Sequence, residues 1–534
     1  MKRNKKLLQQ LQQNWAKPKE TAFNFNNIEE LFTAKEAVPS PYTLTDRTAE
    51  DLDFFEFFKF IDRTTSAVGQ QYLYQHLRQL KYTPSYLHEL EERIEFYNKE
   101  ANKRLETQTI LHGLSTQNDY YFPFLMYGAL PTKLSFYWLI RLLQMLFFGG
   151  VLVAIVNPAF VIPLILLFSV HLFLHYWHKN RIGNFATIFS RLVRLTSTAR
   201  KLLKDSHLPK SAAADLQGKV KRIEKITAKV LFLKTHDLQD NMIGSFLWFI
   251  TELFKIASLG EITTFHSIVD KMETNRGEVE DLFVFIGEVD IAISIASLRT
   301  GLPYYSQAQW IVTKKEIAVV DLYHPLVPNC VGNDLHLVDK SLLLTGSNMS
   351  GKSTFIRAVN LNAIAAQTLN TSFTKSYTAP FFALATSIRI TDDLTDNKSY
   401  YMEEVNTIGQ LLAFSKTEDA AFLFTIDEVF KGTNTIERIS AAKAILGYLN
   451  KGQHIILVST HDIELTTLLS EGFDLHYFQE SIEAETLSFD YKLKKGALQK
   501  KNAIRILEIA GYPKEVIAEA QELSVHFEKE KTGW

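Results

Sequence analysis

The sequence predicts an α/β domain at the carboxyl-terminal end of the chain, preceded by an all-α region that a two-helix apolar hairpin interrupts. After about residue 315, short β-rich apolar runs alternate with helical patterns, which is typical of α/β domains. Before that point, long helical patterns contain few glycines or prolines. Within the helical part, no Asp, Glu, Lys or Arg occurs from Leu142 to His178, and this run indicates the hairpin.

Composition limits the class of protein. The chain has 534 residues, of which 46% are hydrophobic and 22% charged, and these values exclude wholesale disorder and collagen-like repeats. The formal net charge of -1 gives no global electrostatic reason for a nucleic-acid or membrane partner, so such a partner requires a local patch. Cys330 is the single cysteine, which excludes an internal disulfide and favours a reducing, cytosolic setting.

Residues 45 to about 125 have helical patterns and follow a tail that begins basic. One short helical run there contains five phenylalanines: Phe54, Phe55, Phe57, Phe58 and Phe60. Such a run suits a base-stacking platform, but a helix this apolar is far more often part of a core. We therefore assign these side chains to packing.

The apolar run divides at Asn157-Pro158 into two pieces of 19 residues each, Trp138 to Val156 and Ala159 to Trp177. A helix of this length spans about 28 Å, close to the hydrocarbon thickness of a bilayer. Aromatic and basic residues flank both outer ends, which the positive-inside rule places in the cytoplasm. We expect membrane attachment through residues 138–177. A helical hairpin buried in a soluble core is the alternative, because the run also contains polar side chains.

A basic stretch follows the hairpin. From Arg181 to Asp240, thirteen Lys or Arg residues stand against five acidic residues. A phosphate-binding face, a segment attracted to anionic lipid and a solvated helix face all account for this excess. The spacing shows no base-reading module, so the three alternatives stay open.

The most specific motif lies between a predicted strand and a predicted helix. Ser341 to Leu344 has the pattern of a buried strand, and Thr345 leads into GSNMSGKS, a full match to G-x-x-x-x-G-K-[ST]. Small residues let backbone N–H groups turn around phosphate oxygens at a helix N-terminus. Lys352 is predicted to neutralise the β- and γ-phosphates, and Ser353 to ligate Mg²⁺. The motif thus predicts a site for ATP and Mg²⁺.

Two further buried parallel strands are predicted, Phe422 to Ile426 and Ile455 to Ser459, each followed by a polar loop. After the first strand, Asp427 is predicted to bind Mg²⁺ and Glu428 to orient or deprotonate the water that attacks the γ-phosphate. After the second, His461 is placed to hydrogen-bond the γ-phosphate or that water. Paired acids often cap helices and lone histidines are often structural, but ligands of α/β sheets bind where such loops gather.

Four segments together resemble the MutS-type ATPase of DNA mismatch repair proteins, an ABC-class P-loop domain. They are TGSNMSGKST, DDLTDNKSYYMEEV, IDEVFKGTNT and STHDIELT, in the order and approximate spacing of that family. YKLKKG and NAIRILEIAGYPKEVIAEA resemble the family's helical dimerisation tail. The resemblance covers at least residues 320 to 525.

The resemblance implies roles for individual residues. Asp427 and Glu428 match the Walker B pair, and His461 matches the switch histidine. Ser399 with Glu404 matches the signature loop that reaches the γ-phosphate of the opposite protomer, so a homodimer with two composite sites is implied. The predicted nucleotide-binding residues are Gly346, Ser347, Asn348, Met349, Ser350, Gly351, Lys352, Ser353 and Thr354. The predicted catalytic residues are Glu428 and His461, and the predicted metal ligands are Ser353 and Asp427.

The predicted organisation combines these patterns. It comprises a basic N-terminal tail (1–44), a MutS-like helical core part (45–130), a transmembrane hairpin (131–179), a helical core and lever region (180–314), the ATPase domain (315–495) and the dimerisation tail (496–534). The segment before the core is too short for the family's mismatch-recognition and connector domains. The hairpin has no counterpart in the repair proteins, which indicates a membrane-anchored, MutS-related subgroup.

Two functions follow from the sequence. The first is a MutS-like, mismatch-repair-related ATPase that works as a dimeric clamp on double-stranded DNA. The alternative is a membrane-tethered ABC-class ATPase switch that acts on a protein or lipid partner without DNA. Both place the ATPase domain at the cytoplasmic face of a membrane.

Overall fold

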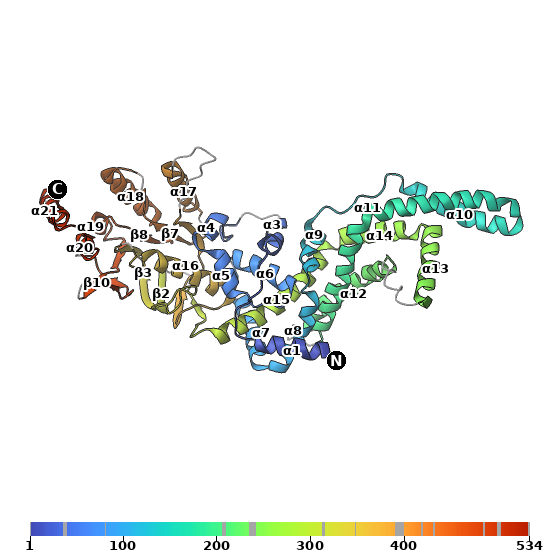
Figure 1. Ribbon diagram of the computed structural model, residues 1–534, viewed down its shortest axis with the longest axis horizontal. Coiled ribbons are helices and arrows are strands. Elements are labelled where there is room, and N and C mark those ends of the chain that lie inside the picture. The colour runs from blue at the N-terminus through green and yellow to red at the C-terminus, as the bar shows by residue number, and fades with distance from the viewer. Residues whose placement is uncertain are drawn as a thin grey trace. The chain divides into compact units, whose positions relative to one another are not determined.

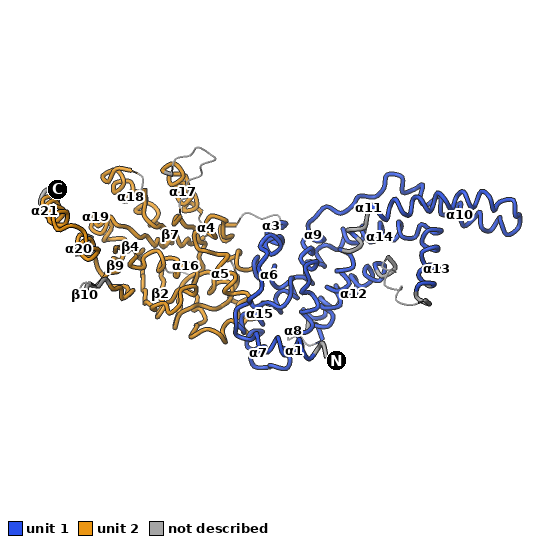
Figure 2. Tube along the Cα trace, in the orientation of Figure 1, with its two compact units in different colours: residues 1–37, 63–75, 93–297 blue, residues 38–62, 76–92, 298–534 orange. Residues whose placement is uncertain are grey.

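The computed structural model groups the chain into two compact units, each assembled from separate parts of the sequence (Figure 2). The first unit comprises Met1–Ala37, Arg63–Gln75 and Arg93–Ser297, and the second comprises Val38–Asp62, His76–Glu92 and Leu298–Trp534. The structure describes residues 2–35, 40–80, 82–204, 210–233, 242–311, 315–347, 349–389, 400–417, 420–430, 433–483, 486–498 and 503–531.

A six-stranded sheet organises the second unit (Figure 1). Its strands, in spatial order, are β12 (Lys494–Lys495), β9 (Phe473–Tyr477), β4 (Ser341–Thr345), β8 (Ile455–Ser459), β7 (Phe422–Asp427) and β6 (Ala383–Ser387). All neighbours are parallel except β12, which runs antiparallel to β9. Every residue of β4 and β8 is buried, as expected for parallel strands covered on both faces. The α/β prediction and all three predicted strands are confirmed.

Smaller sheets and helices complete this unit. A four-stranded sheet has the order β1 (Ala308–Trp310), β5 (Ser376–Ala379), β2 (Glu316–Leu322) and β3 (Asn333–Val338), and β10 (Glu480–Glu483) pairs with β11 (Thr486–Phe489). The helices are α16 (Lys352–Leu369), α17 (Tyr400–Phe414), α18 (Thr435–Leu449), α19 (Glu464–Leu468), α20 (Ala503–Ile509) and α21 (Lys514–Lys531). Helix α16 is the most buried, and its Asn360 Nδ2 donates to Thr425 Oγ1 of β7 at 2.7 Å. This bond fixes the helix after the glycine-rich loop against the neighbouring strand.

Two early segments of the chain also belong to the second unit. Residues 38–62 contain α4 (Asp46–Asp51) and α5 (Phe54–Ile61), and residues 76–92 contain the first part of α7 (Pro84–Lys99). The buried carboxylate of Asp51 accepts hydrogen bonds from Thr386 Oγ1 of β6 (2.6 Å) and, just beyond that strand, from Ile388 N (3.0 Å) and Arg389 N (2.8 Å). Three of the five phenylalanines of α5 are fully buried, as the packing assignment expects, whereas Phe55 is exposed. The compact unit therefore extends beyond the predicted ATPase boundary at residue 315.

The first unit is helical in its described residues. Its elements are α1 (Lys2–Gln13), α2 (Phe25–Ile28), α3 (Glu30–Ala34), α8 (Ala101–Leu111), η1 (His112–Leu114), η2 (Gln117–Tyr121), α9 (Phe122–Tyr127), α10 (Tyr137–Val156), η3 (Pro158–Phe160), α11 (Val161–Leu202), α12 (Lys210–Leu233), α13 (Met242–Ser258) and α14 (Gly260–Thr274). Helices α6 (Ala67–Arg78) and α15 (Arg276–Gly301) contribute most of their residues to it. The all-α prediction is confirmed for this unit, but β1 (Ala308–Trp310) lies within the region 180–314 that the sequence predicted to be helical.

The apolar hairpin consists of α10 and α11, joined by the turn η3. The predicted break at Asn157-Pro158 is confirmed, but the second helix continues to Leu202 instead of ending near Trp177. No proline follows Pro163 within α11, so nothing in that sequence interrupts the helical hydrogen bonds. The predicted boundary at residue 179 thus lies inside one continuous helix.

Both helices of the hairpin are long and apolar enough to cross a membrane, a criterion of length and composition alone. The two candidate spans are Tyr137–Val156 and Pro158–Arg181, and only 11% of each is buried. Ile155 and Val156, for example, are 76% and 86% exposed. The described part of this chain therefore does not bury the hairpin in a core of its own.

Asp290 of α15 joins two helices of the first unit. Its fully buried carboxylate accepts hydrogen bonds from Thr65 N (2.8 Å), Ser66 N (2.8 Å) and Ser66 Oγ (2.6 Å), just before α6 begins. Burial disfavours the charged carboxylate more than these donors favour it, and raises the pKa of Asp290 to about 6.

This shift predicts a pH-dependent stability. Since the folded pKa lies above the unfolded one, the folded state binds more protons than the unfolded state between about pH 4 and pH 6, and that stabilisation is lost as the pH rises through about 6. The amide introduced by Asp290→Asn cannot ionise, so the variant lacks this pH dependence. The difference in unfolding free energy, wild type minus variant, will therefore fall by up to about 3 kcal/mol from pH 4 to pH 7. Urea unfolding of both proteins across this range measures the difference, and a constant difference would contradict the prediction.

Candidate functional site

Two glycines shape the loop between β4 and α16. Gly346 has φ +149°, and a Cβ there would lie 2.7 Å from the carbonyl oxygen of Phe478. Gly351 has φ +104° and stands directly before the first residue of α16. These backbone conformations require glycine. They turn the chain so that the open N–H groups of the helix N-terminus face the end of the sheet, which favours anion binding.

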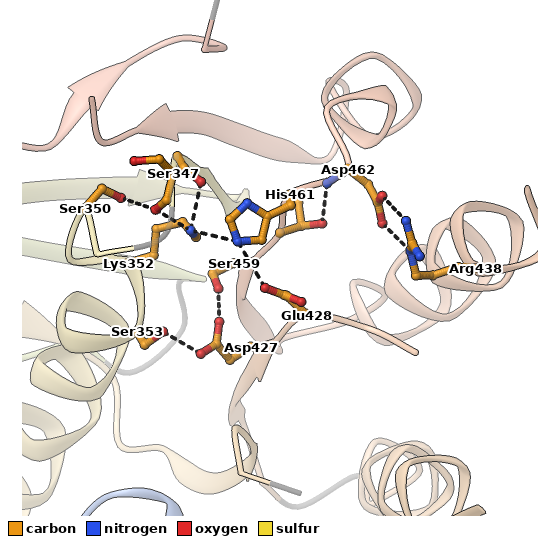
Figure 3. A network of polar contacts seen from close by, with 12 residues as sticks. Ser347, Ser350, Lys352, Ser353, Asp427, Glu428, Arg438, Ser459, His461 and Asp462 are labelled. Carbon is orange, nitrogen blue, oxygen red and sulfur yellow. Dashed lines mark hydrogen bonds and ion pairs between the residues drawn. The ribbon is translucent and has the colours of Figure 1, made fainter. Parts of the chain in front are cut away.

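Lys352 lies at the centre of the site (Figure 3). Its Nζ donates to the carbonyl oxygens of Gly346 at 2.8 Å and Ser347 at 2.9 Å, and lies 3.3 Å from His461 Nε2. The side chain is buried, and the loop carbonyls hold its charged end where the loop closes. The structure thus places Lys352 within the glycine-rich loop, where the sequence predicts a phosphate-binding lysine.

Asp427, at the end of β7, binds two hydroxyl groups. It accepts a hydrogen bond from Ser353 Oγ at 2.5 Å through Oδ2, and one from Ser459 Oγ through Oδ1. Carboxylate and hydroxyl oxygens are the ligands that Mg²⁺ prefers. Ser353 and Asp427 therefore fit a magnesium site.

Glu428 and His461 face one another across two neighbouring loops (Figure 3). Glu428 Oε1 lies 3.2 Å from His461 Nε2. Glu428 has φ +66°, a left-handed conformation uncommon for a residue with a side chain, and its N–H donates to Ser459 O at 2.9 Å. The turn that follows β7 thus directs Glu428 toward the loop that carries His461.

The sheet order explains why these residues meet. β8 lies between β4 and β7, so the loops that follow the three strands are adjacent at one edge. Together they line a cavity of about 680 Å³. The predicted residues that line it are Ser347, Met349, Gly351, Lys352, Ser353, Thr354, Asp427, Glu428 and His461. His324 also lines the cavity, and burial lowers its pKa to about 4, which keeps this imidazole neutral near pH 7.

Five predicted residues lie outside this set. Asn348 and Ser399 are outside the described residues. Ser350 is buried beneath the loop, where its Oγ donates to Ser347 O at 2.8 Å. Glu404 is 1% exposed within α17 and does not line the cavity. Gly346 contributes its carbonyl oxygen to Lys352 as described above.

Sequence reasoning missed three supporting contacts. Ser459 ends a predicted strand, but nothing in its pattern indicates that it hydrogen-bonds Asp427. Arg438 donates to both carboxylate oxygens of Asp462 at 2.9 and 2.7 Å, and so anchors the loop that carries His461 to α18 (Figure 3). Glu480 accepts from Ser347 Oγ at 2.6 Å. Only Asp462 had a sequence signal, its place beside His461.

The parallel sheet, the glycine-rich loop and the paired acids define a domain of the P-loop nucleotide-binding class. Residues 342–528 match the family model of MutS domain V. The chain is 31% identical over 282 residues to the DNA mismatch repair protein MutS of Staphylococcus epidermidis, and equally so to that of Staphylococcus carnosus. It is 32% identical over 256 residues to the protein of that name from Staphylococcus aureus. Its similarity to MutS proteins therefore includes this nucleotide-binding domain.

The similarity is confined to part of each protein. The matches to the Staphylococcus epidermidis and Staphylococcus carnosus proteins cover 50% of this chain and 32% of each relative. For the Staphylococcus aureus protein the shares are 46% and 29%. The chain thus spans about a third of the length of the curated relatives it matches.

Proposed function

We propose that this chain is a MutS-like ATPase that binds ATP with Mg²⁺ and hydrolyses the γ-phosphate. The observation that carries the proposal is the convergence of Lys352, Asp427, Glu428 and His461 on one cavity, from the ends of three adjacent strands. MutS-family proteins are ATPases, and the match to MutS domain V supports the same chemistry here.

Each side chain then has one task. The loop N–H groups and Lys352 bind the phosphate oxygens, and their positive charge stabilises the negative charge that develops on the γ-phosphoryl group. Ser353 and Asp427 hold Mg²⁺, which neutralises the phosphate oxygens when bound. Glu428 orients the attacking water and accepts its proton.

His461 connects Lys352 to Glu428. Its Nε2 lies 3.3 Å from Lys352 Nζ and 3.2 Å from Glu428 Oε1. One ring nitrogen cannot accept from the ammonium and donate to the carboxylate at the same time, because the two contacts require opposite protonation states of Nε2. In our proposal, a change at the γ-phosphate that moves Lys352 therefore changes the hydrogen bonding of Glu428 through this imidazole.

We further propose a homodimer that clamps double-stranded DNA. The curated relatives are DNA mismatch repair proteins by name, which supports a DNA partner. In such a dimer Ser399 and Glu404 serve the opposite protomer, which requires α17 to move because Glu404 is buried within its own chain.

The helical unit offers a phosphate-binding surface of limited extent. Within the basic stretch, Arg200, Lys219 and Arg222 form ion pairs with acidic side chains of the same unit. Four lysines are exposed: Lys201 of α11, Lys204 just beyond its end, and Lys221 and Lys225 of α12. These four supply the charge that we assign to DNA phosphates.

A salt titration tests this surface. In Lys221→Gln/Lys225→Gln, DNA affinity will fall and the slope of log affinity against log salt will become shallower by about 2, because two phosphate contacts are lost. Lys340→Gln, at a half-buried lysine of the other unit, serves as the control and will leave both unchanged. The full-length protein in lipid nanodiscs is measured with homoduplex and mismatched DNA, for binding and for ATP turnover. DNA that neither binds at low salt nor changes turnover would contradict the clamp.

A second candidate function is a membrane-tethered ATPase switch that acts on a protein or lipid partner. The exposed apolar surface of α10 and α11 favours it, with the ATPase domain at the cytoplasmic face. Helix α13 packs against α11 and adds Phe246, Phe249 and Phe254, each more than half exposed. Fractionation of cells that express the full chain tests the membrane attachment, and a fully soluble protein would overturn it.

A further inference from the structure

Three buried side chains from three helices of the first unit converge on one point. His175 lies on α11, Glu252 on α13 and Glu261 on α14. Nε2 of His175 lies 3.2 Å from Oε1 of Glu252 and 3.5 Å from Oε2 of Glu261, and one ligand atom from each residue lies within 4.8 Å of the others. Their exposed fractions are 1%, 5% and 6%. None of them belongs to the nucleotide site.

One oxygen in this cluster lacks a hydrogen bond. Oε2 of Glu261 is buried, points at His175 Nε2 and has no hydrogen-bond partner among the described residues. Nδ1 of His175 is likewise buried without one. A buried polar atom left without a partner costs free energy comparable to a lost hydrogen bond or more, so such atoms usually have a bound ion or water.

We propose that His175, Glu252 and Glu261 bind one divalent transition-metal ion, with Zn²⁺ as the best fit. One imidazole nitrogen and two carboxylate oxygens form a donor set that zinc accepts. Tetrahedral zinc with ligand distances of about 2.0–2.2 Å sets its ligand atoms roughly 3.3–3.6 Å apart. The two spacings from His175, 3.2 and 3.5 Å, agree with this, and the two carboxylate ligand atoms lie within 4.8 Å of each other.

Two lysines beside the cluster define the competing explanation. Lys179 Nζ lies 2.6 Å from Oε1 of Glu252, and Lys255 Nζ lies 3.8 Å from its Oε2. An ion-pair network of this kind stabilises Glu252 without a metal. It leaves Oε2 of Glu261 without a hydrogen bond, however, and a carboxylate oxygen that accepts from lysine keeps a further lone pair for an ion.

A bound ion would have a mechanical consequence for the hairpin. His175 lies in the second candidate span, whereas Glu252 and Glu261 lie on helices outside the two spans. The ion would therefore cross-link the base of the hairpin to α13 and α14 and fix the direction in which the hairpin leaves the helical unit. Folding or docking of the hairpin then depends on the metal.

The test uses the full-length protein in nanodiscs, freed of metal with EDTA and kept in excess Mg²⁺, which occupies the oxygen ligands of the nucleotide site. Titration with Co²⁺ and Zn²⁺ is expected to show one tightly bound ion per chain, visible absorption bands of four-coordinate Co²⁺ and a rise in melting temperature. His175→Gln and Glu261→Gln should each weaken binding by about 10-fold or more. His171→Gln, a buried histidine one turn earlier on α11, is the matched control and retains the ion.

Two results would overturn the site. In the first, the wild type binds no added ion in excess Mg²⁺, and the lysine–glutamate network then accounts fully for the cluster. The other is an ion whose affinity is the same in both ligand variants. If the variants do not fold, X-ray absorption of the zinc-loaded wild type decides: a single imidazole in an oxygen shell supports the site, and several imidazoles or a sulfur ligand contradict it.

Discussion

Glu428→Gln will lower ATP turnover by about 10²–10⁴-fold and leave ATP binding within a few-fold of the wild type. The amide keeps the size of the side chain, so it still contacts His461, but it cannot accept a proton from the attacking water. Lys352 and the glycine loop, which bind the phosphates in our proposal, are unchanged. Steady-state phosphate release gives the turnover number, and nucleotide titration under non-hydrolysing conditions gives the affinity.

An exposed glutamate of the same unit is the matched control for this substitution. Glu437 lies in the first turn of α18, does not line the cavity, and its replacement by Gln should leave both quantities unchanged. Normal turnover in Glu428→Gln would show that another group activates the water. Weaker ATP binding without a loss of turnover would show that Glu428 contributes to binding ATP in the ground state and not to its hydrolysis.

Lys352→Ala will weaken ATP binding itself, by about 10–100-fold, because hydrogen bonds of a charged donor contribute roughly 1.5–3 kcal/mol. The same substitution leaves the carbonyl oxygens of Gly346 and Ser347 without their ammonium donor, so the loop also loses its closed shape. Equilibrium binding of a fluorescent ATP analogue measures the change.

Lys340→Ala removes a lysine whose Nζ lies 3.4 Å from the carbonyl oxygen of Ser470 and which does not line the cavity. It should bind ATP like the wild type. If Lys352→Ala both binds and hydrolyses ATP normally, the glycine loop is not the phosphate site. If it binds normally and turns over slowly, the lysine acts only on the transition state.

The sequence predicted most of the site because its signals are local. Each of the three strands is a largely apolar run. Asp427, Glu428 and His461 follow their runs within two residues, and the glycine loop that leads to Lys352 begins within two residues of its run, so parallel pairing brings these groups to one edge. The glycines of the loop have positive φ values that the motif requires. The contact between Glu428 and His461 follows from strand order, which spacing along the chain does not give.

Long-range polar contacts left no such signal. Asp51 looks like an ordinary acid in a helical stretch, yet it accepts three hydrogen bonds from residues at the end of β6 and just beyond it. His175, Glu252 and Glu261 are far apart in sequence, and only the packing of α11, α13 and α14 brings them together. The continuation of α11 to Leu202 was missed because the prediction ended the helix where its apolar character ends.

The contact between Asp51 and Thr386 has a consequence for biosynthesis. The two residues are separated by 335 positions, and residues 93–297 of the other unit are made in between. Phe54, Phe57 and Phe58 of α5 are therefore synthesised long before the rest of the unit that buries them. Their apolar surface becomes fully buried only when the whole unit has been made. We expect this early segment to need chaperone protection while the helical unit folds first.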